Sequence, residues 1–358
     1  MASKFYTLKI AAVQQETTDA VSITFDVPSK LAETFYFIPG QYLTLRAQID
    51  GADIRRSYSI CAPLGGRLRV GIKTVESGVF STFAQTLKPG DTLQVMPPEG
   101  RFTCDCISTQ KRDLLLIASG SGITPILSIA RSVLEVEPES RVTLIYGNRQ
   151  TASIMFLEEV EDLKDRFLSR FHIYHILSRE AQDVDIFHGR IDPERIDGLM
   201  HRGIIDPNSA DGIFLCGPSE MSLSLSEHFK TFGIEANKIY TELFELPGEG
   251  KPVIISEEIK AAADSGVSIE VILDGIHRKF NLNDVEDTIL SAAEKSGLDL
   301  PFSCAGGMCA TCRCKVVEGA VKMDRNFSLD DWEVDAGYVL ACQSRPKTET
   351  LILDFDAA

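Results

Sequence analysis

The spacing of apolar residues changes twice along the 358 residues of the chain. Up to about residue 110, apolar and polar residues alternate in short runs between Gly, Pro and Asp turns, which is typical of an antiparallel β-barrel. From 111 to 245, continuous apolar runs alternate with helical patterns and predict a doubly wound α/β domain. A Pro- and Gly-rich interval at 246–266 indicates a linker. From 267 to 358, a hairpin pattern precedes one helix and a cysteine-rich loop.

Charge narrows the classes of partner. The formal net charge of −16 argues against binding to nucleic acid or to anionic membrane surfaces. Residues 267–358 carry 9 Lys and Arg against 16 Asp and Glu, a net −7, which suits either docking on a basic partner or simple solubility. No apolar run approaches the roughly 20 residues of a membrane span, and the first residues lack a signal peptide's apolar core. We therefore expect a cytoplasmic protein.

The strongest chemical signal is a group of cysteines. Cys304, Cys309 and Cys312 have the spacing C-x4-C-x2-C and Cys342 follows at a distance, which is the plant-type spacing for a [2Fe–2S] cluster. The glycines between them leave room for the backbone to approach the cluster sulfurs. A structural zinc site is the alternative, although zinc-binding cysteines usually come in CxxC pairs. The sequence therefore predicts a one-electron carrier.

Two stretches of the first region suit a nucleotide ligand. Within a strand, Arg56 and Tyr58 face one side and Ser57 and Ser59 the other. A guanidinium suits a pyrophosphate, and a phenol ring suits stacking on a flat heterocycle. Further on, the segment 78–82 combines a glycine, two hydroxyls and a predicted helix start.

We expect Ser81 to be the N-cap of that helix and the turn before it to bind an anion. Each of the two stretches alone is equally consistent with an ordinary strand or turn, because such short patterns arise by chance.

A glycine-rich turn opens the second region. Gly120, Gly122, Thr124 and Pro125 lie between a continuous apolar run and an amphipathic helical pattern. A strand, a glycine turn and a proline in the first helical turn together predict a phosphate-binding loop. The segment departs from G-x-G-x-x-G, so we expect a dinucleotide site that differs from the standard Rossmann fingerprint.

The predicted strand ends indicate which dinucleotide binds. Arg149 and Arg179 are placed to pair with a 2′-phosphate. The second strand of this region has no acidic residue at its end, where a site that prefers NAD would place one for the ribose hydroxyls. We therefore favour NADPH over NADH.

Together, the Arg-x-Tyr-Ser motif, the Gly-x-x-Ser motif that follows it, the glycine loop and the cysteine spacing resemble the ferredoxin–NADP reductase superfamily. The resemblance implies a FAD-binding barrel at 1–110 and an NADPH-binding α/β domain at 111–245. After the linker, it implies a β-grasp ferredoxin domain at 267–358 that carries the [2Fe–2S] cluster.

The same resemblance assigns roles to candidate site residues. FAD is held by Arg56, Ser57, Tyr58, Ser59, Ile72, Lys73, Gly78, Val79, Phe80, Ser81 and Thr82, with Phe244 near the flavin. NADPH is held by Gly120, Gly122, Thr124, Pro125, Arg149, Ser178, Arg179, Cys216, Gly217 and Pro218. The catalytic candidates are Ser59, Thr124, Cys216 and Glu242. A buried structural cysteine is the alternative for Cys216.

Within this superfamily the chain is similar to the reductase subunits of bacterial phenylacetyl-CoA epoxidases. The segments that carry this resemblance are 55–61, 144–149, 188–192, 309–316, 326–329 and 336–343. The resemblance implies electron transfer from NADPH through FAD and the cluster to the di-iron oxygenase subunits of a multicomponent monooxygenase, in phenylacetate catabolism.

Two alternatives stay open. One is a reductase of the same design that serves a Rieske ring-hydroxylating oxygenase or a ketosteroid hydroxylase. The other, of a different class, is a redox-sensing or electron-storage module without a turnover partner.

The cysteine spacing generates a first prediction. Cys342→Ser is expected to abolish assembly of the cluster, because one iron loses a thiolate ligand, while reduction of the flavin by NADPH continues. Visible absorbance spectra and flavin bleaching measure the two steps separately. Normal cluster absorbance in the variant would contradict the predicted ligand set.

Overall fold

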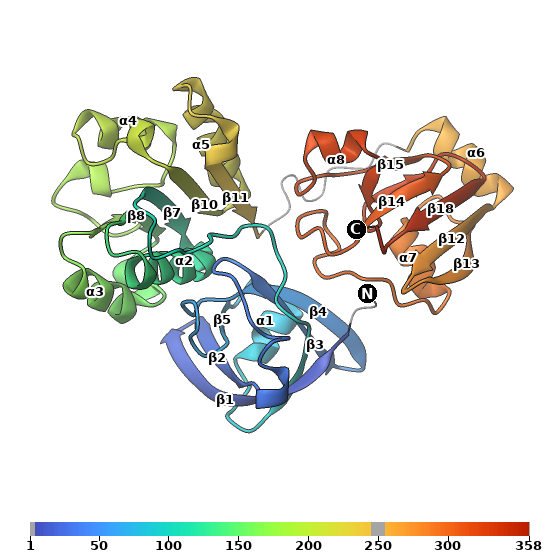
Figure 1. Cartoon of the computed structure of the whole chain (residues 1–358), viewed down its shortest axis with the longest axis horizontal. Coiled ribbons are helices and arrows are strands. Elements are labelled where there is room, and N and C mark those ends of the chain that lie inside the picture. The colour runs from blue at the N-terminus through green and yellow to red at the C-terminus, as the bar shows by residue number, and fades with distance from the viewer. Residues whose placement is uncertain (1–3, 245–254, 358) are drawn as a thin grey trace. The chain divides into compact units, whose positions relative to one another are not determined.

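The computed structural model describes residues 4–244 and 255–357. These residues form two compact units: 6–244 make up one, and 255–357 with residues 4 and 5 make up the other. Figure 1 traces residues 6–244 from blue to yellow and residues 255–357 from orange to red.

An antiparallel six-stranded sheet forms the first half of unit 6–244 (Figure 1). Side chains alternate along each strand, so Leu8 and Ile10 are fully buried while Thr7 and Lys9 are exposed. Phe80, on helix α1, fills the core of this sheet. In sheet order the strands are β4 (Ala52–Ser59), β3 (Tyr42–Ile49), β6 (Thr92–Val95), β1 (Tyr6–Thr17), β2 (Ala20–Asp26) and β5 (Arg69–Lys73), and α1 spans Val79–Ala84.

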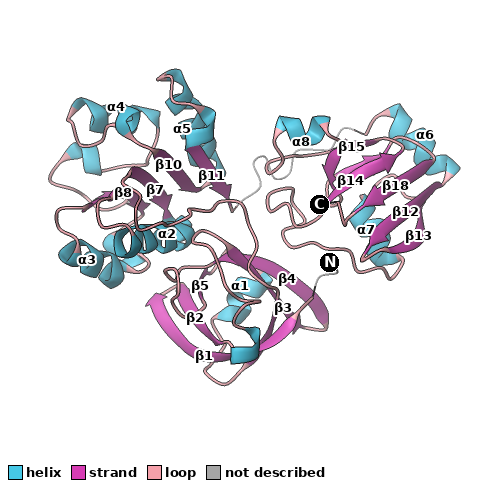
Figure 2. Cartoon of the chain, viewed as in Figure 1, coloured by secondary structure: helices cyan, strands magenta, loops and turns pink. Residues whose placement is uncertain are grey.

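A parallel five-stranded sheet forms the second half of this unit, with helices around it (Figure 2). Leu116 of its central strand packs in the cluster that contains α2 and α3, whereas its neighbour Ile117 packs with α4 and α5. Because both faces are covered, the strands are continuous apolar runs. In sheet order the strands are β11 (Ile239–Leu243), β10 (Gly212–Gly217), β7 (Asp113–Ser119), β8 (Arg141–Asn148) and β9 (Phe171–Leu177). The helices are α2 (Ile123–Val136), α3 (Leu157–Arg166), α4 (Pro193–His201) and α5 (Ser219–Thr231).

Helix α4 is an element that the hydrophobic pattern did not predict. Asp192 caps it by accepting a hydrogen bond from the backbone N–H of Arg195 at 2.8 Å, and Pro193 opens its first turn. An acidic N-cap followed by proline is a helix-start signal, so the sequence did contain the information.

A mixed five-stranded sheet forms the second unit. Strand β18 lies in its middle, parallel to β12 and antiparallel to β14. Asp274 and Gly275 connect β12 to β13 with positive φ angles of 55° and 68°, which suits a two-residue hairpin. The strands of this sheet are β12 (Val267–Leu273), β13 (Ile276–Leu282), β14 (Arg313–Glu318), β16 (Tyr338–Leu340) and β18 (Thr350–Asp354), and a separate two-stranded sheet pairs β15 (Val321–Met323) with β17 (Ser344–Pro346). The helices are α6 (Glu257–Ser265), α7 (Ile289–Lys295) and α8 (Asp331–Asp335).

Part of the interval 246–266, interpreted from the sequence as a linker, is folded. Helix α6 lies within it, and Ile259, Ala262 and Ala263 are buried in the core of the second unit. Residues 246–254 lie outside the described residues. The small residues at 261–263 therefore belong to a packed helix. The predicted fold class, a barrel-like antiparallel sheet, a doubly wound domain and a ferredoxin-like sheet in this order, is confirmed.

Hydrogen bonds join the two halves of unit 6–244. The hydroxyl of Ser128 on α2 donates to the carbonyl oxygen of Ala62 at 2.6 Å, and the backbone N–H of Leu64 donates to Ser132 Oγ at 2.8 Å. Arg69 on β5 makes a bidentate ion pair with Glu159 on α3, at 2.6 and 2.7 Å. These contacts hold the barrel in one orientation against α2 and α3.

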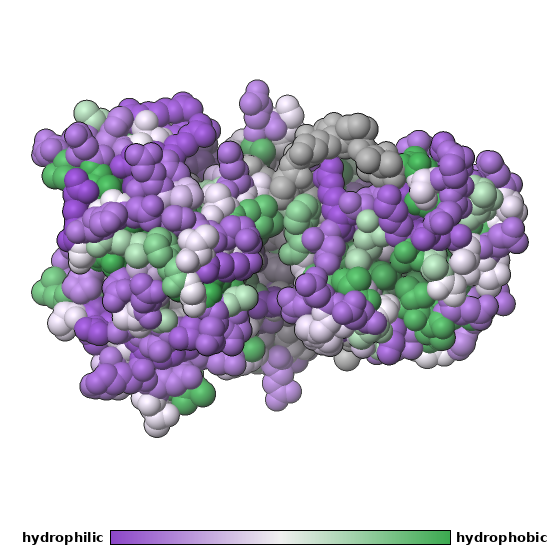
Figure 3. All heavy atoms as spheres, turned by 90° about the horizontal axis from the view of Figure 1, so that it is seen from above, coloured by the Kyte–Doolittle hydropathy of each residue, from purple (hydrophilic) through white to green (hydrophobic). Residues whose placement is uncertain are grey.

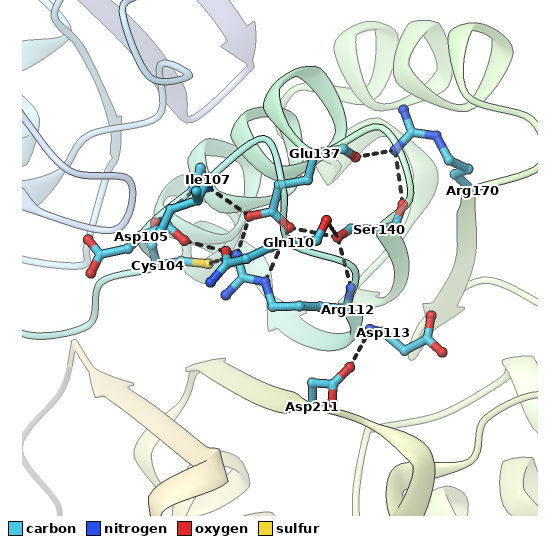
Figure 4. Close-up of polar contacts among 11 residues, drawn as sticks. Cys104, Asp105, Ile107, Gln110, Arg112, Asp113, Glu137, Ser140, Arg170 and Asp211 are labelled. Carbon is cyan, nitrogen blue, oxygen red and sulfur yellow. Dashed lines mark hydrogen bonds and ion pairs between the residues drawn. The ribbon is translucent and has the colours of Figure 1, made fainter.

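A buried carboxylate anchors the segment between the two sheets (Figure 4). Glu137, at the end of α2, has no exposed surface. It accepts hydrogen bonds from Arg112, from Ser140 Oγ at 2.7 Å and from the backbone N–H of Ile107 at 3.3 Å. A buried charge is tolerated only when it is paired and hydrogen-bonded in this way. The network thereby sets where the chain enters β7.

Three-residue 3-10 helices complete the described structure. They are η1 (Ser29–Leu31), η2 (Gly120–Gly122), η3 (Thr151–Ser153), η4 (Asp185–Phe187), η5 (Pro207–Ser209) and η6 (Ala236–Lys238). On the face shown in Figure 3, polar residues cover most of the surface and apolar residues form small groups between them. Across residues 4–244 and 255–357, no helix combines the length and the apolar character needed to cross a bilayer.

Candidate functional site

Strand β4 presents the Arg-x-Tyr-Ser motif as its alternation predicts. Arg56 is exposed, Tyr58 is half-buried and Ser59 is buried on the opposite side. The Tyr58 ring lies 5.6 Å from the ring of Phe80, centroid to centroid. Arg56 Nη1 donates to the carbonyl oxygen of Arg55 at 2.7 Å. The motif therefore offers an aromatic face and a guanidinium on one side of the strand.

The prediction that Ser81 caps helix α1 is wrong, because the N-cap is Gly78. Ser81 lies in the first turn, where its Oγ accepts from the backbone N–H of Val75 at 3.1 Å and donates to the carbonyl oxygen of Gly78 at 3.1 Å. A Cβ atom at position 78 would lie 2.4 Å from that Oγ. Since glycine has no side chain to cap the helix, the first turn of α1 receives no side-chain hydrogen bond from its N-cap residue.

The other candidate flavin residues flank this turn. Ile72 is fully buried in β5, and Lys73 Nζ lies 3.6 Å from Asp19 Oδ1. Val79 and Thr82 are exposed on α1. The structure thus brings β4, the end of β5 and the start of α1 to one side of the barrel core.

The glycine loop lies directly against strand β10. Gly120 has φ +55°, and a Cβ atom at Gly122 would lie 2.1 Å from the carbonyl oxygen of Cys216. Thr124 is buried and donates from Oγ1 to the carbonyl oxygen of Ser121 at 3.0 Å. Pro125 lies in the first turn of α2, as the sequence predicts. Only glycine permits this approach of loop and strand.

Arg149 and Arg179 lie at adjacent strand ends and are both exposed. The backbone N–H of Arg179 donates to the carbonyl oxygen of Arg149 at 2.8 Å, which extends the β8–β9 ladder by one residue. Ser178 continues the same ladder, with its N–H on the carbonyl oxygen of Asn148 at 2.9 Å. The two guanidinium groups therefore stem from neighbouring backbone positions.

Glu180 is a residue of this region that the sequence motifs did not single out. Its carboxylate accepts from the backbone N–H and from Oγ1 of Thr151, both at 2.7 Å. These hydrogen bonds lower the pKa of Glu180 and tie it to the turn after β8. The sequence does show an acidic residue directly after the Ser178-Arg179 pair. It does not show that the carboxylate points toward Thr151.

Three side chains meet where the barrel reaches the parallel sheet. Ser59 Oγ donates to Glu242 Oε2 at 3.1 Å, and Cys216 Sγ lies 3.9 Å from the same oxygen. Cys216 and Glu242 are paired neighbours on β10 and β11. Desolvation raises the pKa of Glu242 to about 8, and burial raises the pKa of the Cys216 thiol. Near neutral pH the group is therefore mostly uncharged and able to hold or pass one proton.

The remaining candidates surround this group. Gly217 follows Cys216 in β10, and a Cβ atom there would lie 3.0 Å from Ser119 Cβ. Pro218 is exposed at the start of α5, and Phe244 is exposed just after β11. The structure thus places the Phe244 ring beyond the strand that carries Glu242.

Two buried polar atoms fit a bound nucleotide at the same edge of the sheet. Asn148 Nδ2 and Ser222 Oγ have no hydrogen-bond partner within the part of the chain that is described. Asn148 ends β8, and Ser222 lies in the first turn of α5 after Pro218. Buried polar groups are rarely left unpaired, so polar atoms of a ligand would satisfy a need that the protein leaves open.

The four predicted cluster cysteines come together in two pairs. A hydrogen bond with Cys309 lowers the pKa of the Cys304 thiol to about 6. A hydrogen bond with Cys342 raises the pKa of the Cys312 thiol. Two pairs suit a cluster of two irons that takes two thiolates on each. In the described residues, no three His, Cys, Asp or Glu side chains converge around a single metal-ion position.

The loop that bears these thiols is shaped by its backbone. Gly306 N–H donates to Cys304 Sγ at 3.3 Å, and Cys304 N–H donates to Cys309 Sγ at 3.5 Å. Ala305 and Ala310 adopt φ angles of +50° and +56°, which costs on the order of 1 kcal/mol each for a residue with a Cβ atom. The donor set and these N–H groups fit a [2Fe–2S] cluster. Cys314 is fully buried on β14, as a packed core cysteine.

Three family models cover the chain in order. An oxidoreductase FAD-binding domain matches residues 7–104, an oxidoreductase NAD-binding domain matches 116–226, and a 2Fe-2S iron–sulfur cluster binding domain matches 271–347. The folds and sites described above thus define a flavin- and nicotinamide-dependent iron–sulfur oxidoreductase.

Full-length relatives narrow this class. The chain is 43% identical over 355 residues to a subunit of 1,2-phenylacetyl-CoA epoxidase from Escherichia coli (strain K12), covering 99% of this chain and 98% of that one. It is 33% identical over 366 residues to the ferredoxin reductase component of a 3-ketosteroid-9-alpha-monooxygenase from Rhodococcus rhodochrous, covering 99% and 97%. The fold matches phthalate dioxygenase reductase with a TM-score of 0.60 at 22% identity, over 98% of both chains. The chain belongs to the family of FAD- and [2Fe–2S]-containing oxygenase reductases that includes this epoxidase subunit.

The desolvated carboxyl group generates a prediction about pH. In the unfolded chain Glu242 has the ordinary pKa of 4.5, but in the folded chain the pKa is about 8. The unfolded state therefore loses this proton first, and the stability of the wild type declines as pH rises from about 4.5 to 8. Glu242→Gln removes the ionisation, so its stability relative to wild type rises between about pH 5 and pH 8, on the order of 2 kcal/mol for a half-buried position.

Urea unfolding at both pH values, followed by circular dichroism, measures this difference. Glu235→Gln, a substitution at an exposed position, is the control and follows the wild type. If the free energies of unfolding of Glu242→Gln and wild type differ by the same amount at about pH 5 and about pH 8, the raised pKa is ruled out.

Proposed function

We propose that this chain is the NADPH-dependent reductase of a phenylacetyl-CoA epoxidase, a multicomponent di-iron oxygenase of phenylacetate catabolism, and that it acts in the cytoplasm. The observation that carries the proposal is the end-to-end match, at 43% identity, to a subunit of such an epoxidase. Flavin, nucleotide and cluster regions follow one another along the whole matched length.

The first task of the protein is to bind the nucleotide. In this proposal the loop from Gly120 to Pro125 and the N-terminus of α2 bind the pyrophosphate, since free N–H groups and the helix dipole favour an anion. Arg149, Arg179 and Ser178 bind the 2′-phosphate, which favours NADPH over NADH. The orientation of Glu180 supports this choice. Its carboxylate is hydrogen-bonded to Thr151, so it does not serve as the acid that an NAD-preferring site offers to the ribose hydroxyls.

The second task is to position the reacting rings. Tyr58 would offer its ring to the flavin, and Arg56 and the turn at 78–82 would hold its pyrophosphate. Phe244 and the 216–218 turn would border the nicotinamide. When bound, FAD accepts a hydride from the nicotinamide, and the [2Fe–2S] cluster passes the electrons on one at a time. Ser59, Thr124 and Cys216 would line the reacting centre, where Glu242 accepts a hydrogen bond from Ser59 Oγ and holds a proton of its own near neutral pH.

The third task is to hold the electron carrier near the surface. Cys304, Cys309, Cys312 and Cys342 are its proposed ligands; Cys312 and Cys342 are buried, whereas Cys304 and Cys309 are half-buried. Met308 and Ala310 lie on the same loop and are half-buried. The acidic character of this unit suits a basic docking surface on the oxygenase.

A second candidate partner is favoured by a specific observation. The 33% identity to a ketosteroid monooxygenase reductase also covers nearly the whole chain. The alternative electron acceptor is therefore the oxygenase component of a ketosteroid monooxygenase. A reductase in either role uses the same residues, so only the acceptor separates the two.

The direct test supplies the purified chain and NADPH to the purified oxygenase subunits of each system. We expect substrate-dependent NADPH oxidation and product formation with the epoxidase subunits only. Turnover with the ketosteroid oxygenase alone would overturn the proposed partner. A chain that fails to reduce even cytochrome c, a general one-electron acceptor, would overturn the reductase itself.

The arginine pair yields a separate prediction about specificity. Arg149→Ala combined with Arg179→Ala is expected to raise KM for NADPH at least about tenfold, because charge-assisted hydrogen bonds to the 2′-phosphate are lost, and to leave KM for NADH nearly unchanged. Steady-state kinetics with both nucleotides measure this difference. Arg202→Ala, on the same half of the unit at the end of α4, is the control. Equal effects on the two nucleotides would refute the role.

A further inference from the structure

Tyr146 carries a hydroxyl that the packing of its ring does not require. The residue lies on β8 with no exposed surface, and its ring belongs to the apolar cluster between the parallel sheet and the helices α2 and α3. A phenylalanine ring would fill the same space. A buried hydroxyl loses its hydrogen bonds to water, so it is tolerated only where the protein supplies a partner.

The partner of this hydroxyl is the glycine loop. Tyr146 Oη donates to the carbonyl oxygen of Gly120 at 3.1 Å, and the carbonyl oxygen of Met155 lies at 3.4 Å. A phenol has a single proton to donate, and Gly120 is the nearer of the two acceptors. The hydroxyl therefore ties β8 to the loop across 26 positions of sequence.

The next carbonyl group of the loop is held in a similar way. Thr124 Oγ1 donates to the carbonyl oxygen of Ser121 at 3.0 Å. The backbone N–H of Ile123 also reaches the carbonyl oxygens of Gly120 and Ser121. Because Tyr146, Ile123 and Thr124 are all buried, both carbonyl groups point toward the interior.

The direction of these carbonyl groups sets the direction of the N–H groups that follow them. No peptide bond in the described part of the chain is cis, and in a trans peptide the C=O and the next N–H point in opposite directions. The N–H groups of Ser121 and Gly122 therefore point away from the interior. Gly120 has φ +55° and Gly122 has φ −60°, and a turn of this kind arranges successive N–H groups into a concave anion site.

We propose that Tyr146 is a positioning residue for the nicotinamide nucleotide: its hydroxyl fixes the Gly120–Ser121 peptide so that the N–H groups of the loop receive the pyrophosphate. This proposal rests on the proposed function, in which the glycine loop binds that group. NADPH and NADH carry the same pyrophosphate, so Tyr146 acts on the affinity for both. In this respect it differs from Arg149 and Arg179, whose proposed target is the 2′-phosphate alone.

The experiment compares Tyr146→Phe with the wild type in the full-length protein loaded with FAD and cluster. Isothermal titration calorimetry measures the dissociation constants of NADP+ and NAD+, and steady-state kinetics measure KM and kcat with NADPH and NADH. Since the variant loses one buried hydrogen bond that orients the loop, we expect both nucleotides to bind about three- to tenfold more weakly. KM is expected to rise by the same factor, with kcat at saturating nucleotide nearly unchanged.

Tyr174→Phe is the matched control. Tyr174 lies on the neighbouring strand β9, and its ring packs on the opposite face of the sheet, stacked against Phe187. The substitution also removes one phenol hydroxyl from the parallel sheet, but on the side away from the glycine loop. It is expected to leave both dissociation constants unchanged.

Four outcomes decide against the inference. Unchanged dissociation constants in folded Tyr146→Phe would overturn it, as would weaker binding of only one of the two nucleotides or an equal loss in Tyr174→Phe. A Tyr146→Phe chain that circular dichroism shows to be unfolded would also overturn it, in favour of a hydroxyl that only stabilises the core. Failure of the wild type itself to bind either nucleotide would instead refute the proposed function, so the two failures can be told apart.

Discussion

The approach of Gly122 to the carbonyl oxygen of Cys216 is the constraint on which the larger unit depends. It sets α2 against the end of β10, and α2 in turn binds the barrel through the hydroxyl of Ser128. Only with the barrel in that orientation does Ser59 reach Glu242 across 183 positions of sequence. A side chain at position 122 would push α2 away from β10. Ser59 and Glu242 would then no longer be held within hydrogen-bond distance of each other.

The junction between the two halves of this unit explains why the Glu242 carboxyl group keeps its proton. Glu242 is half-buried at the junction of the sheet and the barrel, and the partial loss of water around it disfavours its charge and raises its pKa. Ser59 and Cys216 offer hydrogen bonds without offering charge. The site therefore keeps a neutral, proton-bearing group next to the place where negative charge is expected to change, and the surrounding fold compensates for its desolvation.

Much of the architecture followed from periodicity, because the side-chain period of two in strands and the continuous apolar runs of covered strands leave plain marks in sequence. The four cysteines were identified by spacing alone, and their assignment to a cluster stays a prediction. Helix α4 was missed although Asp192 and Pro193 signal its start. Ser81 was assigned to the wrong helix position, since composition does not distinguish a glycine N-cap from a serine that follows it within the first turn.

Contacts between distant segments were the part that the sequence did not reveal. The hydrogen bond from Ser59 to Glu242 and the turn of Glu180 toward Thr151 depend on how separate strands are placed side by side. The unpaired atoms of Asn148 and Ser222, among the described residues, likewise become visible only when burial is known. Motifs thus locate the chemistry, whereas tertiary packing decides each group's direction and charge.

The position of β18 in the second unit has a consequence for the order of folding. Because β18 is the last of that unit's strands in sequence yet lies between β12 and β14, neither the β12–β13 hairpin nor the β14–β16 pair can join a common sheet until it has been synthesised. During translation the larger unit can fold while the cysteine loop still lacks its supporting sheet. The sheet that supports the cysteine loop can therefore be completed only after the strand at 350–354 has been synthesised.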